Sequence, residues 1–291
     1  MKILFGHSRG GKVSGSRFSL ALMCASLLAL SACKGASENA RLKAEPAGRA
    51  ATAPSAPAAN EIVGRFRALD NSKNSTVQVR VTIQDQAGPP RSIQMTMYRK
   101  RQDDGGQKLL MDLSASPEER DRSAVILFGP DGAAEATRFI QSNNSFVTTT
   151  TVTGEDSLFG MTLQELADGQ TEKYDYTLTG EEAVGSTPVY KVEGKLKPAV
   201  ESKFPRLVMS LSKDNGSLRV AEFYDSRDEL ARRLTVTRLE EVGGHLTRMH
   251  WNVDNMARGK KLDFEVVGVK YDTNLNDSLF SKEYLKRISS R

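Results

Sequence analysis

The chain has 291 residues, of which 41 are Lys or Arg and 36 are Asp or Glu. Four of the basic residues and none of the acidic ones precede Cys33, so the chain from Cys33 onward has 37 basic and 36 acidic residues. This near balance excludes the basic footprint of a nucleic-acid-binding protein, and two cysteines are too few for a disulfide framework.

The N-terminal segment has the pattern of a bacterial secretory signal. Residues 1–17 are basic, and residues 18–30 form an apolar run that is shorter than the roughly 20 residues of a membrane-spanning helix. The run ends in "LSAC" at residues 30–33, which resembles a lipobox, the site cut before an acylated cysteine. The resemblance implies removal of a signal peptide at 1–32, with a diacylglycerol and an acyl chain attached to Cys33 and no other cofactor.

The residues after Cys33 indicate where the protein is held. Lys34 takes the position at which an Asp would, in enteric-type sorting, favour inner-membrane retention, so we expect lipid anchoring at the periplasmic side of the outer membrane. Residues 33–60 are rich in Ala and Pro and predict a disordered tether. The remaining residues, 61–291, suit one domain.

Alternating apolar and polar residues predict that this domain is built mainly of antiparallel strands. Strands are expected at residues 75–85, 92–100, 108–113, 124–129, 174–180, 188–196, 206–214, 217–226, 232–242, 245–255 and 260–272. Asn215-Gly216 and Gly243-Gly244 are expected to form hairpin turns with positive φ at both positions. Three helices are expected. They lie at residues 60–69, in a short segment whose capping pattern begins at Thr162, and at residues 277–287.

The alternation also gives the predicted sheet one apolar face. Its members are Leu207, Met209, Leu211, Met249, Trp251, Val253, Leu262, Phe264 and Val266. The opposite face carries Arg248, His250, Asp263 and Glu265. Two interpretations of the apolar face are open: a cavity for acyl chains roofed by short helices, or a filled core beneath those helices. Alternation alone favours the filled core.

Several stretches resemble the Lol-type family of outer membrane lipoprotein-sorting proteins (LolA-like and LolB-like). They are "YDYTLTGEE", "PVYKVEGKLK", "AEFYDSRDEL" and the stretch at residues 258–287. The resemblance implies a strongly curved antiparallel sheet that forms an incomplete β-barrel, closed by a few short helices over an apolar cavity. It also implies that the cavity receives acyl chains of lipoproteins and that no covalent chemistry takes place.

The stretch "VTGEDSLFGMTLQEL" resembles the short lid segment of that family. Within it, Leu158, Phe159 and Met161 are either an apolar loop that delivers cargo or residues that staple the following helix. Met209 stands where many relatives place a Trp, so the detailed shape of a cavity is not implied. The lipobox distinguishes this chain from the soluble carriers of the family, which have a plain signal peptide, and favours a membrane-anchored protein.

No catalytic motif or metal site is predicted. His245 and His250 are five residues apart on one expected strand, so they would lie on opposite faces and could not share a metal ion. We therefore expect a non-enzymatic, anchored carrier or acceptor whose partners are acylated lipoproteins or lipids, the membrane and an envelope handover protein, with no nucleic acid. The alternative is an envelope sensor or scaffold lipoprotein that uses the same fold without transport.

Overall fold

The computed structural model describes residues 57–290, apart from residues 131–133, 151–169, 199 and 201. Pro54–Arg291 form one compact unit, which contains all the hydrophobic clusters found in the described residues. Because this unit has a core of its own, we expect it to fold as an independent domain.

The described residues form thirteen strands of one antiparallel sheet. The strands are β1 (Asn74–Gln84), β2 (Arg91–Arg101), β3 (Gln107–Asp112), β4 (Ala124–Phe128), β5 (Ala134–Ile140), β6 (Ser145–Thr149), β7 (Tyr174–Val184), β8 (Thr187–Leu196), β9 (Arg206–Ser212), β10 (Leu218–Tyr224), β11 (Leu230–Val242), β12 (His245–Asn255) and β13 (Lys260–Tyr271).

Helical segments in the described residues are short. The two α-helices are α1 (Ala59–Ala68) and α3 (Lys282–Ser289), and the single 3₁₀ turns are η1 (Arg120–Arg122), η2 (Gln141–Asn143), η3 (Gln170–Lys173), η4 (Met256–Arg258) and η5 (Asp277–Phe280). Ser281 caps α3, because its hydroxyl accepts a hydrogen bond from the Tyr284 N–H. The helix expected from Thr162 lies outside the described residues.

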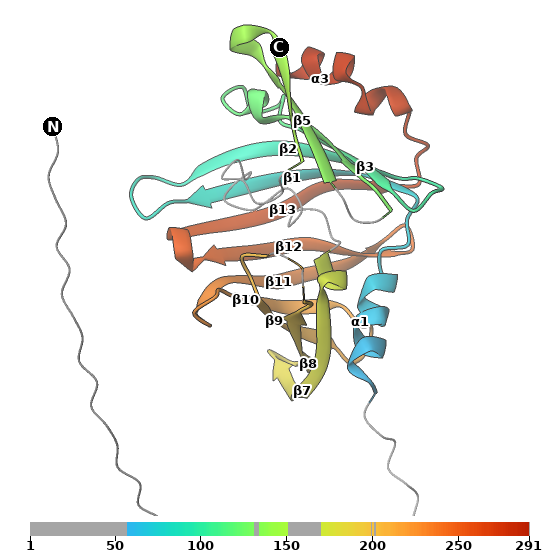
Figure 1. Ribbon diagram of the computed structural model, residues 1–291, viewed down its shortest axis with the longest axis vertical. Coiled ribbons are helices and arrows are strands. Elements are labelled where there is room, and N and C mark those ends of the chain that lie inside the picture. Colours follow the sequence, from blue (N-terminus) through green and yellow to red (C-terminus); the bar gives the residue numbers. More distant parts are fainter. Residues whose placement is uncertain (1–56, 131–133, 151–169, 199, 201, 291) are drawn as a thin grey trace, which may run out of the picture. The chain divides into compact units, whose positions relative to one another are not determined.

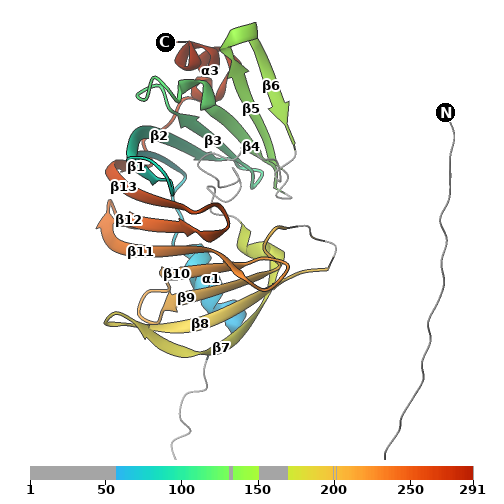
Figure 2. The same cartoon turned by 90° about the vertical axis from the view of Figure 1, so that its left-hand side faces the viewer.

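The strand order is β6-β5-β4-β3-β2-β1-β13-β12-β11-β10-β9-β8-β7. Every pair of sheet neighbours is therefore consecutive in the chain except β1 and β13. The two edge strands, β6 and β7, are also consecutive, and they do not pair with each other. Figures 1 and 2 show the result, a strongly curved sheet that is not closed into a barrel. This confirms the predicted fold class.

The turns agree with the sequence only in part. Gly243 and Gly244 have φ of 60° and 81° and join β11 directly to β12, as predicted. The connection from β9 to β10 is longer, at residues 213–217, and only Gly216 has a positive φ, of 73°. The expectation for Asn215 was wrong because its side-chain oxygen instead accepts a hydrogen bond from the Ser217 N–H, the geometry of an Asx turn.

Buried residues lie on both faces of the sheet. The apolar face, defined by Val79, Val81 and Ile83, carries two hydrophobic clusters. One of these also includes Ile62 and Val63 of α1, which packs on β7 and β9 (Figure 1).

The third cluster lies on the opposite face of β3 to β5. There Leu110, Val125 and Phe139 contact Phe280 and Leu285 of the C-terminal segment. Leu110 belongs to this cluster whereas its neighbours Leu109 and Met111 belong to the apolar face. The terminal helix was expected to bury its apolar side, and it does, but against the face opposite the one that the helices were expected to roof.

Candidate functional site

The nine residues of the predicted apolar surface lie on one face of the sheet. Trp251 is paired directly with Phe264, and Phe264 with Val81. Met209 is paired with Ala221, which is paired in turn with Leu234. Because directly opposed residues of antiparallel strands share a face, this register joins the nine positions. Leu234 packs against both clusters, so the surface is continuous from β13 to β9.

Exposure divides these nine residues into two groups. Leu207, Met209, Leu211, Val253, Leu262, Phe264 and Val266 are each at most 4% exposed. Met249 and Trp251 are partly exposed. The Trp251 ring stacks on the buried Phe264 ring, with centroids 4.9 Å apart and an interplanar angle of 4°. The cluster therefore holds the Trp251 ring in place, and the Arg248 guanidinium lies over that ring, 5.5 Å from its centroid.

The part of the surface on β9 is a packed core. Ile62 and Val63 of α1 are 2% and 1% exposed and belong to the same cluster as Met209 and Leu211. Here the filled-core interpretation applies. The part on β12, β13, β1 and β2 has partly exposed members that pack against its buried cluster: Val77, Met97, Met249, Trp251 and Val269. Sequence analysis missed Val77, Met97 and Val269 as site residues, although their strands were predicted.

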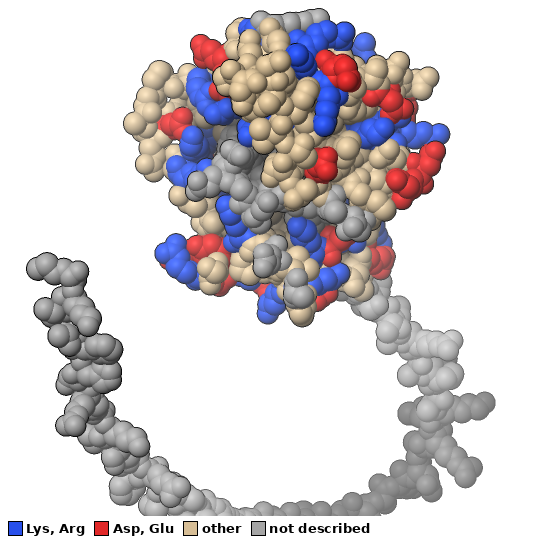
Figure 3. All heavy atoms as spheres, turned by 45° about the horizontal axis from the view of Figure 1, so that its top comes forward, with Lys and Arg blue, Asp and Glu red and all other residues tan. Residues whose placement is uncertain are grey.

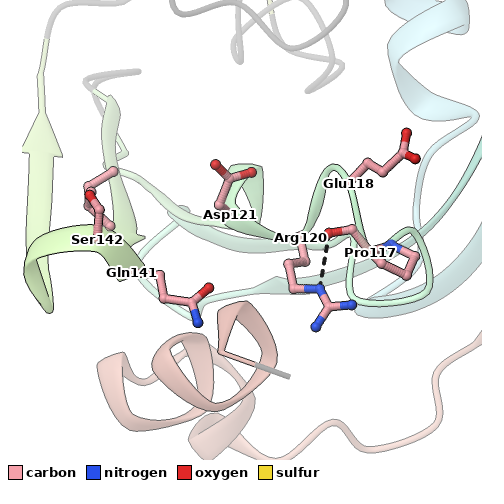
Figure 4. Close-up of a pocket in the computed structure, with 7 residues that line it drawn as sticks. Pro117, Glu118, Arg120, Asp121, Gln141 and Ser142 are labelled. Atoms are coloured by element: carbon pink, nitrogen blue, oxygen red, sulfur yellow. Dashed lines mark hydrogen bonds between the residues drawn. The ribbon is translucent and has the colours of Figure 1, made fainter.

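A separate polar pocket lies near η1 and η2. It has a volume of about 540 Å³ and is lined by Pro117, Glu118, Arg120, Asp121, Ile140, Gln141 and Ser142. Figure 4 shows the side chains of Glu118 and Asp121 directed to one side of the pocket, while the Arg120 guanidinium turns back toward the carbonyl oxygen of Pro117. None of the nine apolar positions contributes to it.

The two histidines lie on opposite faces, as expected, and each has its own partners. His245 Nδ1 is 2.9 Å from the Asn71 side-chain oxygen. On the other face, His250 Nε2 is 2.9 Å from Asp263 Oδ2, and its Nδ1 contacts the Thr237 hydroxyl. Within the described residues no three metal-ligating side chains come together.

The contact with Thr237 could not be predicted, because Thr237 is the extra residue of a β-bulge in β11. The order hydroxyl, imidazole, carboxylate matches that of a catalytic triad. However, Thr237 is exposed and the Asp263 side chain is 45% exposed, on an open face of the sheet. We interpret this chain of contacts as a surface link between three strands.

Charged side chains of both signs are interspersed over the molecular face in Figure 3. Many are paired across strands, as Arg80 is with Glu265 at 2.8 Å. This mixed surface agrees with the balanced composition. No helix in the described residues has the length and apolar character needed to span a bilayer.

Four of the predicted positions lie outside the described residues. They are Cys33, expected to carry the lipid, and Leu158, Phe159 and Met161 of the expected lid segment.

A family model described only as "Uncharacterized protein" matches residues 92–287. Among solved structures, a DUF1329 family protein from Desulfovibrio piger is 20% identical to this chain, with a TM-score of 0.69. The match covers 77% of this chain and 96% of that protein. A putative outer membrane lipoprotein-sorting protein domain from Vibrio parahaemolyticus is 18% identical with a TM-score of 0.69, covering 78% and 97%.

A LolA superfamily protein from Nitrosomonas europaea is 15% identical, with a TM-score of 0.60, and covers 79% of this chain and all of its own length (100%). No curated protein sequence matches the chain. At these identities the likeness shows that the chain shares the fold of these three structures, one of which is a LolA superfamily protein.

Proposed function

Because the chain belongs to the family of uncharacterized proteins whose model matches residues 92–287 and has the LolA-superfamily fold, we propose that it is a non-enzymatic carrier or acceptor of acyl chains. In this proposal the acyl chains of lipoproteins or lipids bind on the apolar face, for lipoprotein sorting at the outer membrane. Lipid attachment at Cys33 would hold the domain at the periplasmic side of that membrane, and an envelope protein would hand over the cargo.

The observation that carries the proposal is the continuous apolar face with an accessible part around Trp251 and Met249. Each CH₂ group that moves from water into contact with such a surface contributes about 0.8 kcal/mol. A chain of typical length therefore binds without any ionic contact. The seven buried positions add affinity only where the ligand displaces protein atoms already packed on them, so we place the first contact at the partly exposed residues.

The chain has a single tryptophan, which makes the proposal directly testable. A bromine atom on an acyl chain quenches tryptophan emission on contact, so dibromostearate should quench Trp251 in a saturable manner. Fluorescence titration of the domain at residues 54–291 measures this. A short brominated acid, which has the same head but too little chain to bury, is expected to leave the emission unchanged.

The matched control is Trp251→Phe, which removes the signal while keeping an aromatic ring on Phe264. In that variant, calorimetry should still detect dibromostearate binding, within about threefold of the original affinity. Absence of saturable quenching in the original chain, together with no heat of binding, would refute the proposal.

The sensor or scaffold function remains the alternative, and one observation favours it: seven of the nine predicted positions are already covered by protein atoms. In that case the apolar face would be a structural core and no acyl ligand would bind. Depletion of the protein from its host would then leave lipoprotein placement normal while changing a signalling output. A carrier predicts the reverse, with lipoproteins mislocated after depletion.

A further inference from the structure

The apolar face becomes polar toward the start of β1. Three successive rows of directly paired residues cross β2, β1 and β13 there: Met95–Val79–Val266, Met97–Val77–Val269 and Arg99–Ser75–Tyr271. The members of the first row are at most 4% exposed, those of the second are partly exposed, and the third is polar. Polarity therefore increases along one direction of the same face; within the polar row Ser75 is 5% exposed, while Arg99 and Tyr271 are partly exposed.

Arg99 is held rigidly in the polar row. Its guanidinium donates to both carboxylate oxygens of Asp70, at 2.7 Å each, and to the Ser72 hydroxyl at 2.6 Å. A guanidinium has five N–H donors, so this arrangement fixes its plane and engages three of them. Asp70, which follows α1 in the chain, also offsets the positive charge. Asp70 is also 3.2 Å from the Arg101 guanidinium, so two arginines share this one carboxylate. Arg99 thus offers its remaining N–H donors, in a fixed orientation, at the border of an apolar surface.

Tyr271 lies across from Ser75 in the same row. Its hydroxyl is 2.9 Å from the Thr247 hydroxyl, which itself donates to the His245 carbonyl oxygen at 3.0 Å. Tyr271 therefore donates to Thr247 and keeps its oxygen lone pairs as acceptors. Burial raises the pKa of Tyr271, so this hydroxyl remains protonated at neutral pH. The His245 ring packs on the Tyr271 ring with centroids 4.4 Å apart, which fixes the tyrosine's position.

We propose that the Arg99–Ser75–Tyr271 row binds the glyceryl ester head of a diacyl ligand, whose chains then extend over the partly exposed Val77 and Met97 toward Trp251. An ester carbonyl accepts from the Arg99 guanidinium, and a glycerol hydroxyl donates to the Tyr271 oxygen. Ester-linked diacylglycerol is also the chemistry found at an acylated lipoprotein cysteine. The inference rests on the proposed function, since it gives that function a ligand class and an orientation.

The test compares two ligands that differ only in the carbonyl groups. Diacylglycerol and the ether-linked dialkylglycerol of equal chain length compete with dibromostearate for the domain at residues 54–291, with Trp251 emission as the readout. A hydrogen bond to a charged group contributes on the order of 1.5 kcal/mol. Diacylglycerol is accordingly expected to compete about tenfold more strongly than the ether lipid.

Two variants of the same strand region identify the source of this preference. Arg99→Lys keeps the charge but loses the planar set of donors, and it should bring the ratio between the two lipids close to one. Arg80→Lys, on the opposite face of β1, should leave the ratio near tenfold. Tyr271→Phe tests the other contact of the row even if Arg99→Lys does not fold: it is expected to weaken both lipids about threefold while the ratio is kept, and unchanged affinity for both would contradict the glycerol contact.

The outcomes separate the inference from the proposed function. Equal competition by the two lipids in the original chain, or equal loss in both arginine variants, overturns the ester assignment while leaving acyl binding intact. Tighter binding of phosphatidic acid than of diacylglycerol would also overturn it, because the row would then be an anion site. Failure of every lipid and of dibromostearate to bind refutes the proposed function itself.

Discussion

At the scale of single residues, close contacts around small side chains determine how the apolar face is filled. Gly194 on β8 is one example. A Cβ atom at this position would lie 2.8 Å from the Tyr176 ring and 3.0 Å from Tyr174 Cβ. Both tyrosines belong to the cluster beneath α1, and the Tyr176 hydroxyl donates to the Thr171 carbonyl oxygen at 2.6 Å. The ring therefore has little freedom to move away, and glycine is required here for space.

We expect Gly194→Ala to lower the free energy of unfolding by about 1–3 kcal/mol, the usual cost of overpacking a core. Urea denaturation followed by circular dichroism measures the change. Gly180→Ala on the adjacent strand β7 is the matched control, because nothing lies within 4 Å of a Cβ built there. Equal destabilisation by the two substitutions would show that the tyrosine contact does not control the effect, because the reduced freedom of the unfolded chain alone would stabilise both variants.

At the scale of secondary structure, the pattern of apolar residues was sufficient to predict eleven of the strands and, through helical spacing, both described α-helices, but not β5 and β6. The β6 sequence, Ser145–Thr149, is short and mostly polar, and its pairing with β5 depends on tertiary context. Alternation also assigns one apolar face to a strand. It could not reveal that β3 is buried on both faces, although the consecutive Leu109, Leu110 and Met111 are consistent with that arrangement.

In the candidate site too, the residues that follow a local pattern were predicted, and those that depend on tertiary contacts were not. The apolar positions of β9, β12 and β13 follow from a period of two, and the structure places them on one face. The polar row could not be predicted, because it requires the register between β1 and β13 and the placement of Asp70 beside Arg99. Strand pairing of residues so far apart in the chain is not encoded in any local pattern.

One carboxylate adds to the apolar contacts that attach the C-terminal segment, and this gives a prediction for pH. Asp277 of η5 accepts from Lys108 at 2.9 Å and from Lys100 at 3.0 Å, on β3 and β2. These hydrogen bonds hold the pKa of Asp277 below its ordinary value. A carboxyl group with a lower pKa in the folded state stabilises the fold above its unfolded pKa, near about 4, and this contribution is lost as the pH falls through the folded pKa.

Asp277→Asn should therefore make the protein less stable at neutral pH and flatten the loss of stability below about pH 4. Thermal unfolding between about pH 3 and pH 7 measures this slope. Asp103→Asn, at an exposed position in the β2–β3 connection, is the control and should leave the profile unchanged. An unaltered profile in the Asp277 variant would show that the two lysine contacts do not contribute.

At the scale of the whole molecule, one strand pair joins the two ends of the domain. All other neighbours in the sheet are consecutive, so their pairing closes only short loops. The β1–β13 pair, in which Val79 faces Val266, brings together segments from near the start and the end of the domain. Closing so long a loop costs more conformational entropy, and contacts of this kind slow folding.

We expect the β1–β13 pair to form late. Val79→Ala is predicted to give a φ-value below about 0.3, whereas Val236→Ala in the β11–β12 hairpin should give a value of about 0.5 or more. Both valines are at most 2% exposed, so each substitution should be large enough to interpret. Stopped-flow folding and unfolding in urea provides the rates. A φ-value at Val79 equal to or above that at Val236 would place this pair in the folding nucleus.

A sealed cylinder has its circumference set by the number and tilt of its strands. In the part of the chain that the structure describes, β6 and β7 each pair with one strand, so this restriction does not apply to the sheet. The spacing between the two edges can change through small adjustments of twist, with every inter-strand ladder kept. Under the proposed function, ligands of unequal bulk would then be bound by the same backbone, with the cost of the adjustment spread over the whole sheet.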